Sequence, residues 1–282
     1  MSASLRLLSW NIHKCTGGID RRYDPGRTAS VIAECDPAIV LLQEVAQDGS
    51  WYRGEKQVDV LGDLLGFPHR AYFVNVRFGP RRGSYGNAIL SKHPIHEAAN
   101  VDLTLLGRKA RSVLHAEVRV PVREGSHRTL HVFNLHLGLS ERERRAQLRR
   151  FLDYLPTARL RARSPVVVAG DFNDVYGTLG QRLLAPEGFR GPARPLRTFP
   201  AWAPVRALDT FWVRGEVDVV ELARAQGRGI RTASDHVPLV ATLAPAAYLA
   251  DQRADPAGDA GLGVEAEAGG AVPLADQKPP HW

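Results

Sequence analysis

The chain has 282 residues, of which 44% are hydrophobic and 24% are charged, a composition typical of a globular protein and not of a fibrous or disordered one. No apolar run approaches the roughly 20 residues of a membrane-spanning helix, and the first residues lack the basic and apolar pattern of a signal peptide. The two cysteines exclude a disulfide framework, and the net charge of +7 favours an anionic partner. We therefore expect a cytoplasmic protein with reduced thiols and no membrane span, and we take it to be a monomer.

Short apolar runs bounded by turn residues predict many strands. They lie at residues 5–10, 38–42, 70–76, 87–90, 95–103, 112–120, 129–137, 165–169, 206–213, 216–222 and 237–243. Several of these strands follow one another after short gaps, so part of the pairing should be antiparallel. An α/β fold with two mixed β-sheets packed face to face and helices outside is therefore favoured over a purely parallel, doubly wound sheet.

Three helices are predicted between the strands. The first begins at Asp24-Pro25, because Asp caps a helix and Pro suits its first turn, and it ends at Asp36-Pro37. The second lies near residues 57–65. The third begins at Ser140, which is expected to form a capping box with Glu143.

The composition changes after residue 245. Residues 246–282 are rich in Ala, Gly, Asp and Pro, and they carry six acidic and two basic side chains, a net charge of −4. We expect a disordered acidic tail there, following one domain at residues 1–245. Because the tail contributes −4 to the total of +7, residues 1–245 carry a net charge of +11. Such a charge suits nucleic acid, a phospholipid headgroup or a phosphorylated metabolite, although arginine use in a GC-rich genome would raise it as well.

Polar side chains recur where the predicted strands begin or end. They are Asn11, His13, Glu44, Asn134, His136, Asp171, Asn173, Asp209, Asp235 and His236. Each alone is typical of a turn or a helix cap. Together they are expected to converge, because the loops at one edge of an α/β sheet form the ligand site. Carboxylate and amide oxygens suit a hard cation, and neither thiolates nor zinc-type histidine spacing accompanies them, so Mg²⁺ or Mn²⁺ is favoured over Zn²⁺.

These motifs carry a specific resemblance in their order and spacing. They read WNIHK (10–14), LLQEV (41–45), GNAILSKHPI (86–95), NLHL (134–137), GDFND (170–174), LDTFW (208–212) and SDHVP (234–238). The series resembles the endonuclease/exonuclease/phosphatase superfamily over about residues 5–243. Its members include pancreatic deoxyribonuclease, abasic-site endonucleases, sphingomyelinases and inositol polyphosphate 5-phosphatases. The resemblance implies a DNase I-like four-layer α/β sandwich and hydrolysis of phosphoesters.

Two further segments narrow the resemblance. HKCTGGIDRRYDPGR (13–27) and TFPAWAP (198–204) are similar to small bacterial members of unsettled substrate. Abasic-site endonucleases usually have an Asp where this chain has His13 and a Tyr where it has His136. His136 is more like the deoxyribonuclease and sphingomyelinase branches, so the difference weakens a role in DNA repair and not the phosphoester chemistry.

The resemblance implies a metal site built from five side chains. Glu44 would be the main Mg²⁺ ligand, with Asn11 beside it. Asp171 and Asn173 would border the metal and the phosphate, and Asp235 would contact the metal or its water.

The resemblance also implies catalytic roles. Asp171 would orient or deprotonate the attacking water, and Asn173 would hold a phosphate oxygen. His236, oriented by Asp209, would act on the phosphate as a general acid–base or as a stabiliser of the transition state. His136 would lie on the scissile phosphate or on the leaving-group side.

Other residues are weaker candidates for substrate binding. Arg81 and Arg82 form a basic loop, Asn87 borders the predicted cleft, and Arg111 precedes a strand, although solvated or paired roles are the commoner outcome for such residues. Trp51 and Trp202 lie in loops, where stacking on a ligand is plausible.

The expected function is that of a metal-dependent phosphodiesterase or nuclease acting on DNA or RNA. A phospholipid or sphingomyelin-type phosphodiesterase, a small-molecule phosphatase and a non-catalytic anion-binding relative remain as alternatives. A lipid enzyme needs an exposed apolar loop, for which residues 191–202 are the candidate.

Overall fold

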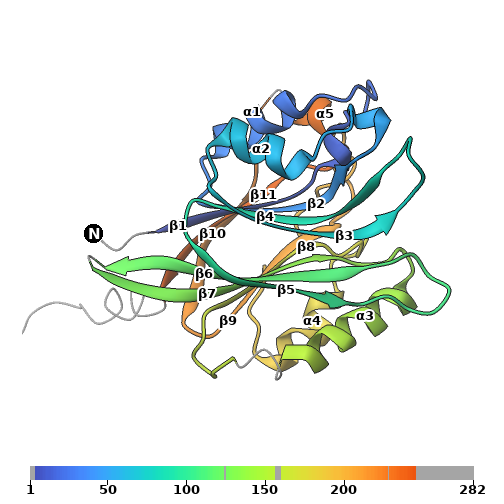
Figure 1. The fold of residues 1–282 in the computed structure, drawn as a ribbon. Helices are drawn as coiled ribbons and strands as arrows, with labels where there is room; N and C mark the ends of the chain where they lie inside the picture. Colours follow the sequence, from blue (N-terminus) through green and yellow to red (C-terminus); the bar gives the residue numbers. More distant parts are fainter. Residues whose placement is uncertain (1–3, 124, 156–159, 228, 246–282) are drawn as a thin grey trace, which may run out of the picture.

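The computed structural model describes residues 4–123, 125–155, 160–227 and 229–245, and it shows two β-sheets packed face to face (Figure 1). The six-stranded sheet has the order β10 (Val217–Arg224), β11 (Leu239–Pro245), β1 (Leu5–Asn11), β2 (Ile39–Gln47), β4 (Ser84–Ser91) and β3 (His69–Arg77). The five-stranded sheet has the order β5 (Ile95–Asp102), β6 (Ser112–Arg123), β7 (Ser126–His136), β8 (Val166–Asp171) and β9 (Asp209–Arg214). The tail predicted at 246–282 lies outside the described residues.

Helices cover the outer side of each sheet (Figure 1). The six-stranded sheet carries α1 (Pro25–Cys35), α2 (Gln57–Leu65) and α5 (Ile230–Ala233), and the five-stranded sheet carries α3 (Glu141–Tyr154) and α4 (Leu179–Leu183). Short 3₁₀ turns add η1 (His13–Cys15), η2 (Ser50–Tyr52) and η4 (Ala185–Glu187). The predicted fold class, a four-layer DNase I-like sandwich of two mixed sheets with helices outside, is confirmed.

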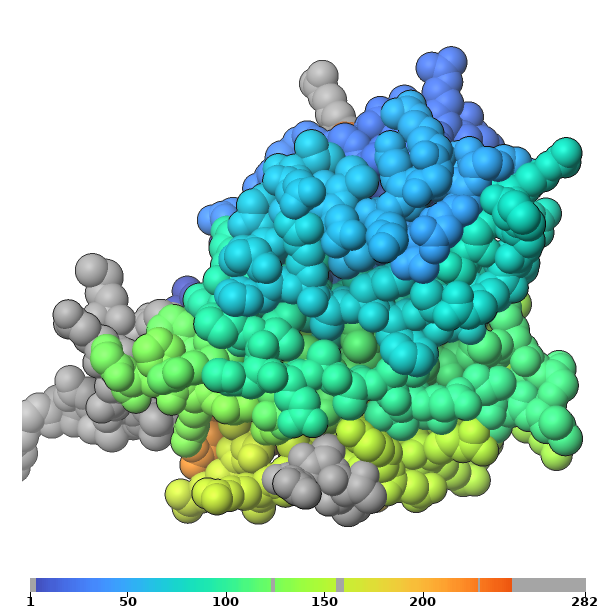
Figure 2. Space-filling model, in the orientation of Figure 1, coloured from blue at the N-terminus to red at the C-terminus, as the bar shows by residue number. Residues whose placement is uncertain are grey.

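Alternating apolar side chains explain the layers. On β1 and β2, Leu7 and Leu41 pack into the core between the two sheets, whereas Leu8 and Val40 pack against the helices. The same period of two recurs on β8, so each strand is buried on both faces. Figure 2 shows the result: the N-terminal residues, from blue to cyan, form one half of the molecule, and green and yellow residues form the other.

The helix starts follow the predicted caps. The Asp24 side chain accepts a hydrogen bond from the Arg27 backbone N–H at 3.3 Å, and the Ser140 hydroxyl accepts one from Glu143 N–H at 3.3 Å. The predicted capping box is otherwise wrong, because the Glu143 carboxylate accepts instead from Gln147 Nε2 at 3.5 Å. The helices α4 and α5 were not predicted, since they span five and four residues and are too short for a periodic signal.

Strand direction brings the predicted polar residues to one end of the sandwich. β1 runs parallel to β2 and β7 runs parallel to β8, so their carboxyl ends meet at the same edges. β9 is antiparallel to β8 and begins at Asp209, directly opposite Asp171. β2 extends beyond its predicted end at residue 42, because a bulge around Glu44 lets it continue to pair with β4.

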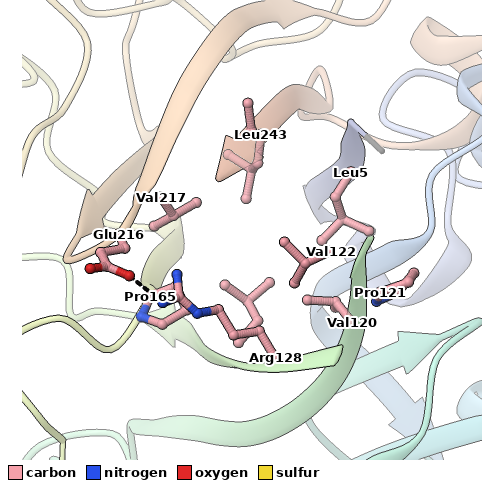
Figure 3. A pocket seen from close by; sticks show the side chains of 11 residues that line it. Leu5, Val120, Pro121, Val122, Arg128, Pro165, Glu216, Val217 and Leu243 are labelled. Carbon is pink, nitrogen blue, oxygen red and sulfur yellow. Dashed lines mark hydrogen bonds and ion pairs between the residues drawn. The ribbon is translucent and has the colours of Figure 1, made fainter. Parts of the chain in front are cut away.

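The opposite end of the sandwich has different chemistry (Figure 3). A pocket there is lined mainly by apolar side chains, among them Leu5, Val120, Val217 and Leu243. Its charged pair, Arg128 and Glu216, is joined by an ion pair, shown as a dashed line in Figure 3. Such a pocket offers no set of convergent ligand atoms. In the described ranges no helix has the length and the apolar content needed to cross a bilayer.

A buried histidine pair lies on the helix-facing side of the five-stranded sheet. His115 Nε2 lies 3.2 Å from His131 Nδ1, and the rings are inclined by only 27° with centroids 5.4 Å apart. The two nitrogens therefore face each other directly, as in an N–H···N hydrogen bond between neutral imidazoles and not as in two ligands that converge on one ion. Burial lowers the pKa of His115 to about 4, and burial also lowers the pKa of His131.

This pair predicts a loss of stability in acid. Below about pH 6.5 the unfolded chain binds a proton at His115 that the folded protein excludes, so the free energy of unfolding should fall between about pH 6.5 and about pH 4. The loss should be roughly 3 kcal/mol at most, at about 1.4 kcal/mol per pKa unit. Urea unfolding at several pH values should show a shallower dependence for His115→Gln than for wild type. His96→Gln, an exposed histidine on β5, is the control; equal slopes in all three proteins would contradict the prediction.

Candidate active site

Three buried side chains form the centre of the site. Asp171 ends β8, Asp209 begins β9 opposite it, and His236 lies just before β11. His236 Nδ1 lies 2.9 Å from Asp209 Oδ2, and its Nε2 lies 3.9 Å from Asp171 Oδ2. The Thr198 hydroxyl donates to the same Asp209 oxygen at 2.5 Å. Asp209 is thereby fixed, and it fixes the ring of His236 in turn.

Charge in this centre is coupled. Burial by itself would lower the pKa of His236, but Asp209 and Asp171 outweigh burial and hold it well above its usual range. Burial raises the pKa of Asp171, and repulsion from Asp209 adds to this against the attraction of His236. The arrangement therefore pairs a cationic imidazolium with a carboxylate that binds protons more readily than usual.

Asn11 and Asn173, two of the predicted site residues, hold Asp171 in place. Asn11 Nδ2 donates to Asp171 Oδ2 at 2.9 Å, and the Asn173 backbone N–H donates to Asp171 Oδ1 at 2.9 Å. Asn173 Nδ2 donates to the Leu137 carbonyl, which leaves its amide oxygen for a ligand. Asn173 also has φ +50°, a sparsely populated conformation of the kind that gathers at functional sites.

Glu44 lies in the bulge of β2, and its backbone has φ +56°. Its carboxylate forms an ion pair with the Lys14 ammonium. Burial would raise the pKa of Glu44, but the positive charge of Lys14 outweighs it and holds the value at about 2. Lys14 belongs to η1, in which three successive non-glycine residues, His13 to Cys15, have φ between +45° and +60°. Gln57 Nε2 donates to the Lys14 carbonyl at 2.8 Å and holds this left-handed turn.

His136 and Arg111 add a second, different pair. His136 Nε2 lies 3.6 Å from Asp171 Oδ2, and burial together with the charge of Arg111 lowers the pKa of His136 well below its usual range. This imidazole is therefore neutral, in contrast to His236. The Arg111 side chain is 4% exposed, and its Nε and Nη1 have no hydrogen-bond partner. Arg111 makes no ion pair with a described carboxylate, so its buried N–H groups are free to bind an anion.

The remaining predicted residues lie farther out. Asp235 is half-buried at the rim, with Oδ1 4.0 Å from His13 Nδ1. Asn87 is fully buried between the sheets, where its Nδ2 donates to the Ser112 and Asn134 carbonyls. Arg81 and Arg82 are exposed on the turn between β3 and β4. The structure thus brings Asn11, Asp171, Asn173, Asp209 and His236 into one cluster, joined by hydrogen bonds and by the His236–Asp171 ion pair. It places Asn87, Arg81 and Arg82 apart from this cluster.

Sequence reasoning did not single out three residues that shape this site. Lys14 pairs with Glu44, Thr198 bonds Asp209, and the Ser234 hydroxyl donates to the Asn11 carbonyl at 2.7 Å. All three lie inside motifs that the sequence did identify, at 10–14, 198–204 and 234–238. For Lys14 and Ser234 the available signal was an ammonium or hydroxyl two or three residues from a predicted site residue, whereas Thr198 lies 11 residues from Asp209 and gave no such signal.

The donor set fits a divalent cation. The side chains predicted to hold a metal, which are Asn11, Glu44, Asp171, Asn173 and Asp235, all offer oxygen atoms, as hard cations prefer. Asp171, Asp209 and His236 also place ligand atoms within 4.8 Å of one another. Asp209 Oδ1 is buried without a partner, which is costly for a carboxylate unless a cation or donor meets it.

Comparison with known proteins agrees with this geometry. Residues 8–236 match the model of the Endonuclease/Exonuclease/phosphatase family. The chain belongs to this family. The uncharacterized protein YbhP of Escherichia coli (strain K12) is 32% identical over 252 residues, which cover 85% of this chain and 96% of the relative. Membership confirms the resemblance derived from the motifs and identifies the chain as a phosphoester hydrolase by family.

Solved structures of the family share the fold. An endonuclease/exonuclease/phosphatase from Beutenbergia cavernae DSM 12333 superposes with a TM-score of 0.72 at 26% identity, covering 86% of this chain and 72% of that one. The human Nocturnin catalytic domain with bound sulfate superposes with a TM-score of 0.65 at 21% identity, covering 86% and 94%. At that identity the second likeness shows the fold alone, so the substrate must be argued from this chain's own residues.

Proposed function

We propose that this protein is a Mg²⁺-dependent phosphodiesterase that cleaves DNA or RNA, with Mn²⁺ as an alternative cation. The observation that carries the proposal is the buried cluster of Asp171, Asp209 and His236, in which one imidazole is cationic and one carboxylate is a stronger base than usual. Hydrolysis of a phosphoester needs both a base for water and positive charge for the phosphate oxygens.

Each of these groups has a task in the displacement. Water attacks phosphorus while the bond from phosphorus to the leaving oxygen breaks. Asp171 takes the proton of the attacking water, and the leaving oxygen takes a proton from bulk water. His236, held cationic by Asp209, donates to a phosphate oxygen and offsets the charge that develops there. Neutral His136 and the unpaired N–H groups of Arg111 offer further hydrogen-bond donors to the same phosphate.

Five oxygen-bearing side chains would hold the cation. They are Asn11, Glu44, Asp171, Asn173 and Asp235. A bound divalent cation supplies Lewis-acid neutralisation of the phosphate charge. Glu44 suits the role of main ligand because its carboxylate stays ionised down to about pH 2.

Nucleic acid is favoured over lipid by the surroundings of the site. The segment 191–202, the candidate lipid loop, is tied to the centre: the Phe199 ring lies 5.0 Å from the His236 ring, and Ala201 N–H donates to the Asp235 carbonyl. A segment held in this way is a wall of the site and not a free apolar loop. The charge of +11 on residues 1–245 also favours a polyanion.

Hydrolysis assays of the purified protein with Mg²⁺, with Mn²⁺ and with EDTA test this function. The substrates are bis-p-nitrophenyl phosphate, p-nitrophenyl phosphate, supercoiled plasmid, single-stranded RNA, sphingomyelin and phosphatidylglycerol vesicles. We expect turnover that EDTA abolishes, with diesters cleaved faster than the monoester and nucleic acid faster than lipid. If a lipid or the monoester is cleaved faster than nucleic acid, the proposed substrate class is wrong. If no substrate is turned over with either metal, the proposed enzymatic activity is wrong.

A further inference from the structure

A groove of aromatic and cationic side chains opens directly beside the catalytic centre. It has a volume of about 750 Å³, and Trp51, Phe78, Arg82 and Tyr85 line it. Lys14 joins the two sites, because its ammonium pairs with Glu44 and also lies 4.7 Å from the centroid of the Tyr85 ring. A substrate whose phosphate lies in the centre would therefore extend into this groove.

One side of the groove is built by two loops that are bonded to each other. Trp51 comes from η2, and its backbone N–H donates to the Arg81 carbonyl in the turn between β3 and β4 at 3.0 Å. That turn projects from the right-hand side of the molecule (Figure 1). Gly83, at φ +59°, allows the close approach, since a Cβ atom there would lie 2.1 Å from the Gln47 carbonyl oxygen. The groove is thus preformed.

Cations in the groove lie over aromatic faces. The Arg82 guanidinium is 5.2 Å from the Trp51 ring centroid and 5.7 Å from that of Phe78, and the Lys109 ammonium is 5.0 Å from the Tyr85 centroid. None of the described residues that line the groove is acidic. Despite these contacts, Trp51 and Phe78 remain 56% and 41% exposed, which is unusual for large apolar side chains.

We infer that this groove binds the nucleoside next to the scissile phosphate, in single-stranded form. The inference rests on the proposed function and names its substrate class. A nucleic-acid base offers a flat ring for Trp51 and Phe78, and its flanking phosphates match Arg82 and Lys109. In a duplex the bases are stacked on each other and cannot reach these side chains, so an unpaired strand or a short nucleotide ester is the fitting substrate.

The membrane alternative fits the same residues less well. A membrane-docking loop presents apolar side chains outward, whereas here Arg82 packs over the rings of both exposed aromatics, and the rings line a walled groove. The pairing of rings with cations is the pattern of proteins that bind single strands without sequence preference.

The test compares two esters that release the same leaving group. p-Nitrophenyl thymidine 5′-phosphate carries a nucleoside, and bis-p-nitrophenyl phosphate does not. In Trp51→Ala and Arg82→Ala, the ratio of kcat/KM for the nucleoside ester to that for the other ester should fall at least tenfold, mainly through KM. Trp51→Phe should keep most of the ratio, because a phenyl ring can still stack. Phe73→Ala is the control, since Phe73 on β3 is a 45% exposed aromatic side chain and lines a different hollow of the surface.

Binding gives a readout that does not depend on turnover. Titration of Asp171→Asn protein with oligothymidylate should show tighter binding than an equal duplex, and the added Trp51→Ala change should weaken it at least tenfold. If the variants stay active and their ratio of kcat/KM for the two esters is unchanged, or if binding is equal with and without Trp51, the inference about the groove is wrong. The proposed phosphodiesterase activity would not be affected by that result. If Trp51→Ala weakens binding to phosphatidylglycerol vesicles but not to oligothymidylate, the inference is also wrong. If the protein binds oligothymidylate in a Trp51-dependent way but shows no turnover, only the proposed catalysis is contradicted.

Discussion

Asp171→Asn should lower kcat on bis-p-nitrophenyl phosphate by roughly a thousandfold or more, while the protein stays folded. Asn has the shape of Asp but cannot take a proton from water, and general base catalysis contributes about 10²- to 10⁴-fold. The melting temperature should hold or rise, because the change removes a buried negative charge next to Asp209. Steady-state kinetics and thermal melts of the same samples check both expectations.

Asp174→Asn is the matched control for this variant. Asp174 is also buried, three residues further on, but its carboxylate accepts a hydrogen bond from the Leu179 backbone N–H and bonds nothing in the catalytic centre. Loss of the Asp174 carboxylate should lower the melting temperature, since a hydrogen bond to a charged group contributes about 1.5–3 kcal/mol. It should leave kcat within about twofold of wild type. If Asp171→Asn kept more than a tenth of wild-type kcat, the role of Asp171 as a base would be wrong. A Mg²⁺ titration of that variant separates loss of a base from loss of a ligand.

The architecture could be predicted from the sequence because its signals are local and repeated. Runs such as 38–42 and 165–169 are apolar at every position, which marks strands buried on both faces, and polar residues follow them at once. Strand direction then forces those polar residues to one edge. The convergence of Asp171, Asp209 and His236 is a consequence of topology and needs little from the exact loop shapes.

The strained parts of the site could not be predicted in the same way. The left-handed turn at His13 to Cys15 and the positive φ of Glu44 oppose the intrinsic preference of those residues, so no propensity indicates them. They exist because packing and Gln57 hold them, and these are contacts between distant segments. The groove has the same origin, since Trp51 and Arg82 come from separate loops that meet only after folding.

These strained elements change how the site handles charge. Lys14 reaches Glu44 only because η1 is left-handed, and it gives the main predicted metal ligand a cationic partner of its own. A divalent cation must compete with that ammonium for one carboxylate. The metal affinity of this protein should therefore depend on Lys14 as well as on the ligands.

Opposite changes in metal affinity are expected from the two halves of this ion pair. Glu44→Gln should raise the apparent Kd for Mg²⁺ at least tenfold and lower kcat/KM in step, because an amide is a weaker ligand than a carboxylate. Lys14→Met should lower that Kd about three- to tenfold, equivalent to about 0.6–1.4 kcal/mol, because the competing ammonium is gone. Isothermal titration of substrate-free protein measures both. A Lys14→Met protein that binds Mg²⁺ no more tightly than wild type would show that the ammonium does not occupy the metal's place. A Glu44→Gln protein with unchanged affinity would move the metal to the carboxylates of Asp171 and Asp209.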